Sequence, residues 1–186
     1  MDKADRKSEF EQEAWVILRE HRRRAATFPL NILVWGPSDD GTREYKARCM
    51  IRDELKKRGH NAEFSEVLCK AKDAIPDAMH DEFLQALSAD AIIMIYGSRG
   101  TQTERDTILV YPDVACKTFL LVEESVWSNI QNTMVSKSWE KMAGLATVIR
   151  YESPELLESK VDLICNQMQE MRKECYVKRL QSRGVF

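Results

Sequence analysis

The sequence of 186 residues contains few of the residues that build disulfide-linked or metal-linked folds. Its five cysteines are scattered, no Cys-x-x-Cys pair occurs, and their odd number argues against a disulfide framework. The three histidines stand apart from one another and from the cysteines, so we expect no metal site. We interpret the cysteines as small apolar residues of a protein in a reducing compartment.

Long apolar runs and a large charge of one sign are also missing. The longest apolar runs fall far below the roughly 20 residues that cross a bilayer, and the polar start of the sequence is unlike a secretory signal. A net charge of -2 provides no general attraction for nucleic acid or for an acidic membrane surface. We therefore expect a cytoplasmic protein that binds neither nucleic acid nor membrane.

The residues that are present are typical of a globular α/β protein. Hydrophobic residues make up 44% of the chain and charged residues 31%, and the length suits one domain. Short apolar segments predict strands over residues 31–36, 61–67, 91–96, 117–122 and 147–151. Amphipathic or capped segments predict helices over 5–26, 42–58, 78–89, 126–143 and 154–182, and one after Glu104.

The alternation of strands and helices predicts a parallel sheet that is covered by helices on both faces. Right-handed crossovers and five strands suit the flavodoxin-like order 2-1-3-4-5. We expect a single domain with an amino-terminal helical extension over residues 1–28, a core over 30–153 and a carboxyl-terminal helix over 154–186.

Both terminal helices carry apolar faces of their own. In the first helix this face comprises Phe10, Ala14, Trp15, Ile17 and Leu18. In the last helix it comprises Leu157, Val161, Ile164, Met168, Met171 and Cys175, at spacings of four and three. Such faces suit packing of the last helix on the sheet and the first helix, and they also suit self-association. We expect a homo-oligomer or a partner protein to bind through the terminal helices.

A glycine-rich loop follows the apolar segment 91–96 and leads to the acidic residue Glu104 at the expected start of a helix. In open α/β sheets, ligands bind beyond the carboxyl ends of such strands. Gly97 and Gly100 allow a ligand to approach the backbone, and Arg99 can pair with a phosphate. A carboxylate at position 104 can stabilise an oxocarbenium-like sugar or attack its anomeric carbon. The alternative is a capping box formed by Thr101 and Glu104.

The turn after the first expected strand lies beside this loop in the predicted topology. Its acidic pair, Asp39 and Asp40, can bind ribose hydroxyls, and Tyr96 can stack on a base. Turn and cap chemistry for the pair, and a half-buried strand position for Tyr96, are the plainer alternatives. Glu66 is expected to be a solvated strand end. The candidate binding residues are Trp35, Gly36, Pro37, Ser38, Asp39, Asp40, Tyr96, Gly97, Ser98, Arg99, Gly100 and Thr101.

The segment from Ala89 to Glu104 resembles the glutamate motif of the nucleoside 2-deoxyribosyltransferase-like superfamily, which is close in fold to TIR and TIR-like domains. Residues 32–37 and 117–122 are similar to its first and fourth strands, and the likeness extends over about residues 30–153. The resemblance implies that Glu104 is catalytic, that NAD or another nucleotide is the substrate, and that no resident cofactor is needed. It implies an NADase or NAD-derived signal producer of the kind used in bacterial antiviral defence, or a transferase. A non-catalytic TIR-like module that binds a nucleotide signal or a partner protein remains the alternative.

Overall fold

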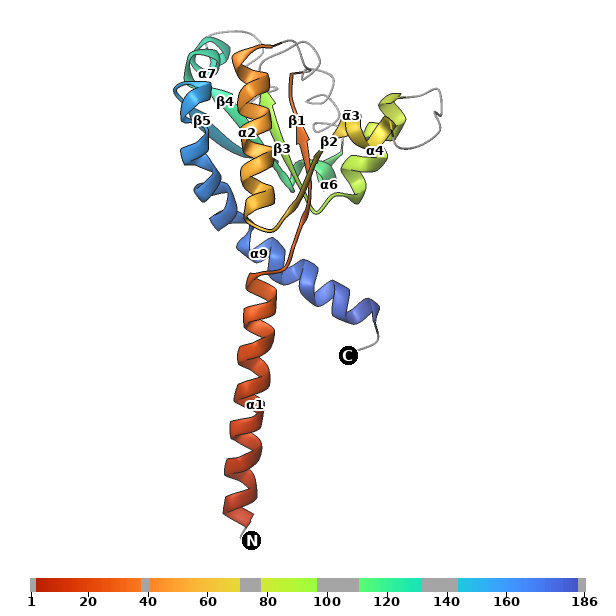
Figure 1. Cartoon of the computed structure of the whole chain (residues 1–186), viewed down its shortest axis with the longest axis vertical. Coiled ribbons are helices and arrows are strands. Elements are labelled where there is room, and N and C mark those ends of the chain that lie inside the picture. The colour runs from red at the N-terminus through yellow and green to blue at the C-terminus, as the bar shows by residue number, and fades with distance from the viewer. Residues whose placement is uncertain (1–2, 38–40, 71–77, 97–110, 132–143, 184–186) are drawn as a thin grey trace. The chain divides into compact units, whose positions relative to one another are not determined.

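A computed structural model describes residues 3–37, 41–70, 78–96, 111–131 and 144–183. It contains a five-stranded parallel sheet in the order β2-β1-β3-β4-β5, which confirms the predicted fold class and strand order (Figure 1). The strands are β1 (Asn31–Trp35), β2 (Asn61–Phe64), β3 (Ala91–Tyr96), β4 (Thr118–Glu123) and β5 (Thr147–Tyr151).

Helices connect the strands and flank the sheet. They are α1 (Lys3–Ala26), α2 (Arg43–Lys57), α3 (Ser65–Lys70), α4 (Ala78–Ser88), α6 (Pro112–Ala115), α7 (Glu124–Gln131), the short 3-10 helix η1 (Pro154–Leu156) and α9 (Glu158–Ser182). None of the described helices is both long enough and apolar enough to cross a membrane.

One predicted boundary near the sheet edge was wrong. The second strand ends at Phe64, and helix α3 occupies the end of the segment that was predicted as strand. Glu66 in the first turn of α3 favours a helix start, since a carboxylate stabilises the positive end of the helix dipole. Pro112 opens the short helix α6, where its missing N–H and restricted φ are tolerated; the helix expected after Glu104 lies outside the described residues.

Helix α2 begins and ends as its sequence predicts. The Thr42 side chain accepts a hydrogen bond from the Tyr45 N–H at 3.2 Å, which caps the first turn. Gly59 follows the helix with a φ of +83°, a conformation that glycine adopts without strain. The helix is therefore held at both ends, and its buried side chains meet the sheet in a defined register.

The core has a layer of apolar side chains on each face of the sheet. On one face, side chains from β1, β3 and β4 pack with residues of α4, α6 and α7; this cluster includes Leu33, Trp35, Ala86, Met94, Val114 and Leu120. The opposite side chains of the strands are equally buried, as are Ile51 and Leu55 of α2. Leu157, just before α9, and Val161, Ile164 and Met168 within it are fully buried, so the first half of the predicted apolar seam is a packing surface.

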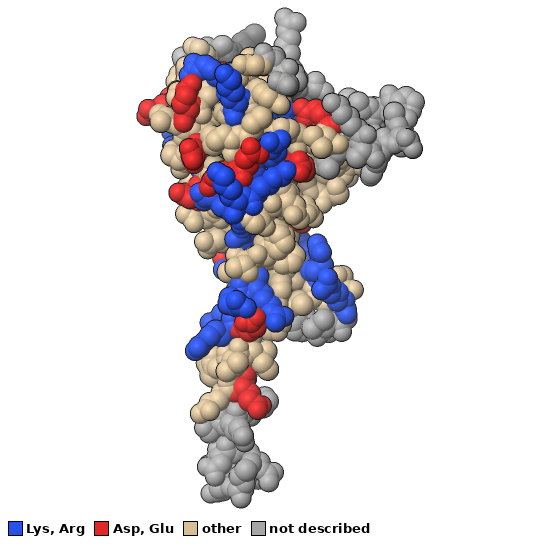
Figure 2. All heavy atoms as spheres, in the orientation of Figure 1, with Lys and Arg blue, Asp and Glu red and all other residues tan. Residues whose placement is uncertain are grey.

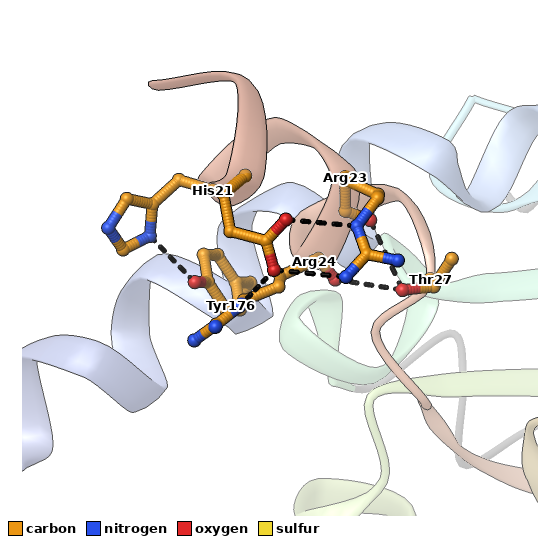
Figure 3. A network of polar contacts seen from close by, with 6 residues as sticks. His21, Arg23, Arg24, Thr27 and Tyr176 are labelled. Carbon is orange, nitrogen blue, oxygen red and sulfur yellow. Dashed lines mark hydrogen bonds and ion pairs between the residues drawn. The ribbon is translucent and has the colours of Figure 1, made fainter. Parts of the chain in front are cut away.

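Residues 1–29 and 169–186 form a compact unit distinct from residues 30–168. Within it, the last turns of α1 contact α9: the His21 Nδ1 and Tyr176 hydroxyl lie 2.7 Å apart (Figure 3). The Arg172 Nη1 also donates to the Ala26 carbonyl at 2.7 Å. The Phe28 ring packs edge-on against Tyr176. The middle of α1 differs from this, because residues 15–18 are all exposed.

Candidate functional site

The carboxyl ends of β1 and β3 lie side by side in the centre of the sheet. Trp35, the last residue of β1, pairs in register with Met94 of β3. The strand order reverses between these two strands, which is where open α/β sheets bind ligands. Four predicted site residues lie at this edge: Trp35, Gly36, Pro37 and Tyr96. The others (Ser38, Asp39, Asp40, Gly97, Ser98, Arg99, Gly100, Thr101 and Glu104) lie outside the described residues.

Gly36 begins the turn after β1 and is closely surrounded. Its φ is +153°, and a Cβ at this position would lie 3.2 Å from the Arg48 Cδ and 3.3 Å from the Ile95 carbonyl oxygen. Both distances are shorter than ordinary van der Waals contacts. A side chain here would push the turn away from β3, so glycine is required for the close approach of the two strand ends.

Arg48 of α2 joins the end of β1 to the start of α3. Its guanidinium is fully buried and donates to the Val34 carbonyl from Nε at 3.2 Å and Nη2 at 2.7 Å, and from Nη1 to the Pro37 carbonyl at 3.0 Å. It also forms a bidentate pair with Glu66 at 2.6 and 2.7 Å and stacks on the Phe64 ring at 4.3 Å. These contacts hold the turn after β1 in place, because every arm of a rigid, planar group has a partner.

Glu66 and Glu82 show opposite pKa shifts near this guanidinium. Burial by itself would raise the pKa of Glu66, but hydrogen bonds from Arg48 and from the chain outweigh burial and lower it. The pKa of Glu82 on α4 is raised by burial and by the negative charge of Glu66, with Arg48 acting in the opposite direction. Both carboxyl groups therefore feel the charge of the Arg48 guanidinium.

Trp35, at the end of β1, carries an unusual buried donor. Its side chain is 1% exposed, and its indole N–H meets no acceptor among the described residues. Tyr96 is half-buried and packs against the same apolar cluster. A buried N–H without an acceptor is uncommon in folded proteins and is a group that a bound ligand can satisfy.

Sequence reasoning missed Arg48 and Glu82 and misjudged Glu66. Arg48 stands three residues before Ile51 and seven before Leu55, so it belongs to the apolar stripe of α2. A cation on such a stripe signals a buried pair, and that signal was available in the sequence. Glu66 was expected to be a solvated strand end, but its carboxylate pairs with Arg48 and its side chain is 41% exposed. Its partner is distant in the sequence, so no local pattern reveals the pair.

A pocket of about 350 Å³ lies elsewhere, at the amino ends of β1 and β2. Its polar lining comprises Asn31, Asn61, Glu63, Gln85 and Ser88. Several of these groups bond within the protein: the Asn61 amide donates to the Asn31 side-chain carbonyl at 3.0 Å, and Lys56 pairs with Glu63. This end of a parallel sheet is opposite to the one where ligands bind, so the pocket is a weaker candidate.

No protein-family model matches the sequence, and no curated protein matches it. Within the described ranges, no three histidine, cysteine or acidic side chains gather as a metal ion would require. The functional argument therefore depends on the sheet topology and on the groups at the carboxyl ends of β1 and β3.

Proposed function

We propose that this protein cleaves or exchanges the N-glycosidic bond of NAD or a related nucleotide. The observation that carries the proposal is the parallel pairing of β1 with β3, in which Trp35 lies opposite Met94. This pairing brings the turn at Gly36 next to the end of β3, after which the sequence continues into the glycine-rich loop and Glu104. The resemblance to the glutamate motif then makes Glu104 the nucleophile or the group that stabilises the oxocarbenium-like sugar.

The surrounding groups support this chemistry in distinct ways. Gly36 lets the turn approach the end of β3 closely, and Arg48 holds that turn by its carbonyl groups. Nicotinamide leaves NAD as a neutral molecule because it is cationic in the substrate, so NAD needs no strong general acid. A nucleotide with an uncharged base does need one, and the raised pKa of Glu82 suits a proton donor.

A binding module without catalysis is the second candidate, and a specific pattern favours it. Thr101 and Glu104 have the spacing of a capping box, in which the carboxylate accepts a hydrogen bond from a backbone N–H of its own helix. In that role Glu104 would not meet a substrate sugar. The same sheet edge would then bind a nucleotide signal or a partner protein and leave it unchanged.

The test is whether the purified full chain releases free base from NAD and then from nucleoside monophosphates. Chromatography measures the released base. We expect the wild-type chain to release base and Glu104→Gln to abolish the release while changing the unfolding free energy by about 1 kcal/mol or less. Glu158→Gln is the matched control, because it removes a carboxylate from the first turn of α9. This control should retain full activity.

The enzymatic proposal is overturned if the wild-type chain releases no base from any of these nucleotides. The assay is run both at concentrations where the chain is monomeric and at concentrations where it is associated. Binding of the same nucleotides without cleavage, measured by calorimetry, would establish the second candidate. Full activity of Glu104→Gln would refute the role of Glu104 even if the chain is an enzyme.

A further inference from the structure

The middle of α1 exposes a block of apolar side chains. Trp15, Val16, Ile17 and Leu18 are 62%, 67%, 58% and 48% exposed. Four consecutive residues cover most of the circumference of a helix, so no single face of α1 is covered along this turn. An apolar surface of this kind marks an interaction site in a protein that is otherwise polar on its surface.

Charge is arranged in opposite senses on the two sides of this block. The segment 9–13 directly before it carries Glu9, Glu11 and Glu13, after the cations Lys3, Arg6 and Lys7 at the start of the helix. The sequence after it carries Arg19, Arg22, Arg23 and Arg24 with only Glu20 of opposite sign. Figure 2 shows acidic, apolar and basic segments following one another along α1. Where an acidic segment, an apolar block and a basic segment follow one another along a helix, these segments are complementary to themselves when a second copy runs in the opposite direction.

The register follows from the helical period. Glu11, Trp15, Leu18 and Arg22 are separated by four, three and four residues, so they share one narrow stripe, as in a coiled-coil seam. A second antiparallel copy centred between positions 16 and 17 places Trp15 against Leu18 and Glu11 against Arg22, twice each by symmetry. A parallel copy would instead place Glu11 against Glu11 and Arg22 against Arg22, which is repulsive.

We propose that α1 is a dimerisation helix that binds a second copy of this chain in an antiparallel pair through Glu11, Trp15, Leu18 and Arg22. The stripe from Glu11 to Arg22 spans about 18 Å of this 24-residue helix, which is enough for nearly two heptads of contact. The His21 ring faces Tyr176 (Figure 3), and Ala26 and Phe28 also contact α9, whereas the four residues of the stripe are all exposed. This inference does not depend on the proposed enzymatic function.

The test is sedimentation of the full chain over a range of concentrations, with charge reversals on the stripe. We expect the wild-type chain to dimerise and Glu11→Arg or Arg22→Glu alone to weaken dimerisation at least tenfold, because each creates two repulsive contacts. The double variant Glu11→Arg/Arg22→Glu should restore the dimer, since the pairs are reformed with their signs exchanged. Glu13→Arg is the control, because position 13 lies on the opposite side of the helix from the stripe.

Mixing the two single variants provides the sharpest measurement. Each contains like charges at positions 11 and 22, so each should be largely monomeric by itself, whereas their mixture should form a heterodimer with all pairs attractive. A wild-type chain that stays monomeric at every concentration overturns the proposal. So does a dimer that the single reversals leave unchanged, or one that Glu13→Arg weakens equally.

Discussion

Replacement of Arg48 by methionine is the perturbation that most directly tests the structure of the candidate site. Methionine retains much of the apolar length of arginine but provides no donor and no charge. The change leaves the Val34 and Pro37 carbonyl groups without the guanidinium and removes the partner of Glu66. We expect the turn after β1 to lose its main anchor.

The magnitude follows from burial. A buried acceptor that loses its donor costs about 1–3 kcal/mol, and two carbonyl groups are affected. The Glu66 side chain is 41% exposed and regains water, so its share is small compared with that of a fully buried carboxylate. We therefore expect Arg48→Met to lower the unfolding free energy by about 3–4 kcal/mol.

Chemical denaturation of a double-mutant cycle checks this reasoning. Glu66→Gln leaves a fully buried cation without a counter-charge and should cost about 2–3 kcal/mol. The double variant with Arg48→Met should cost about 2 kcal/mol less than the sum of the single variants, because the two side chains interact directly.

Arg52→Met is the matched control. Arg52 stacks on the same Phe64 ring at 4.4 Å, but its ionic partner is the exposed Asp53, so we expect a cost below about 1 kcal/mol. A cost below about 1 kcal/mol for Arg48→Met, or strict additivity in the cycle, would refute the anchoring role of Arg48.

Two further predictions concern the same edge of the sheet. Gly36→Ala should lower the free energy of unfolding by about 1–3 kcal/mol in denaturant, because its Cβ would meet Arg48 and Ile95. Gly59→Ala has open space around it and should lower it by only about 1 kcal/mol, through backbone strain. Equal losses for the two variants would contradict the close packing at Gly36. The raised pKa of Glu82 means that the folded state keeps a proton at pH values above the ordinary 4.5, where the unfolded chain has lost it, so stability falls as pH rises through that range. Glu82→Gln should therefore be more stable than the wild type at pH 7 and similar to it at pH 4, as measured by unfolding at both values; a variant that is less stable at pH 7 would reverse the sign of the argument.

The position of the strands could be predicted because each is a short apolar segment between turn residues. The segments 91–96 and 147–151 were predicted with their observed bounds, and the cap at Thr42 and the glycine at position 59 marked the ends of α2. Strand order followed from general rules of handedness and connection. The error at residues 65–67 arose because a helix of six residues is too short to show a helical period.

The composition of the sequence and the spacing of its apolar residues by themselves determined an α/β fold and an apolar seam on the last helix, because both depend on local spacing. The parallel sheet in the order 2-1-3-4-5 followed from common rules of connection. Only the tertiary structure decided that Arg48 is buried against Glu66, that Gly36 has no room for a side chain and that Trp15 and Leu18 of α1 are exposed. Each of these depends on which distant segments meet. The period of α2 places Arg48 on its apolar stripe, but the identity of its partner Glu66 and the packing around Gly36 leave no periodic signal in the sequence.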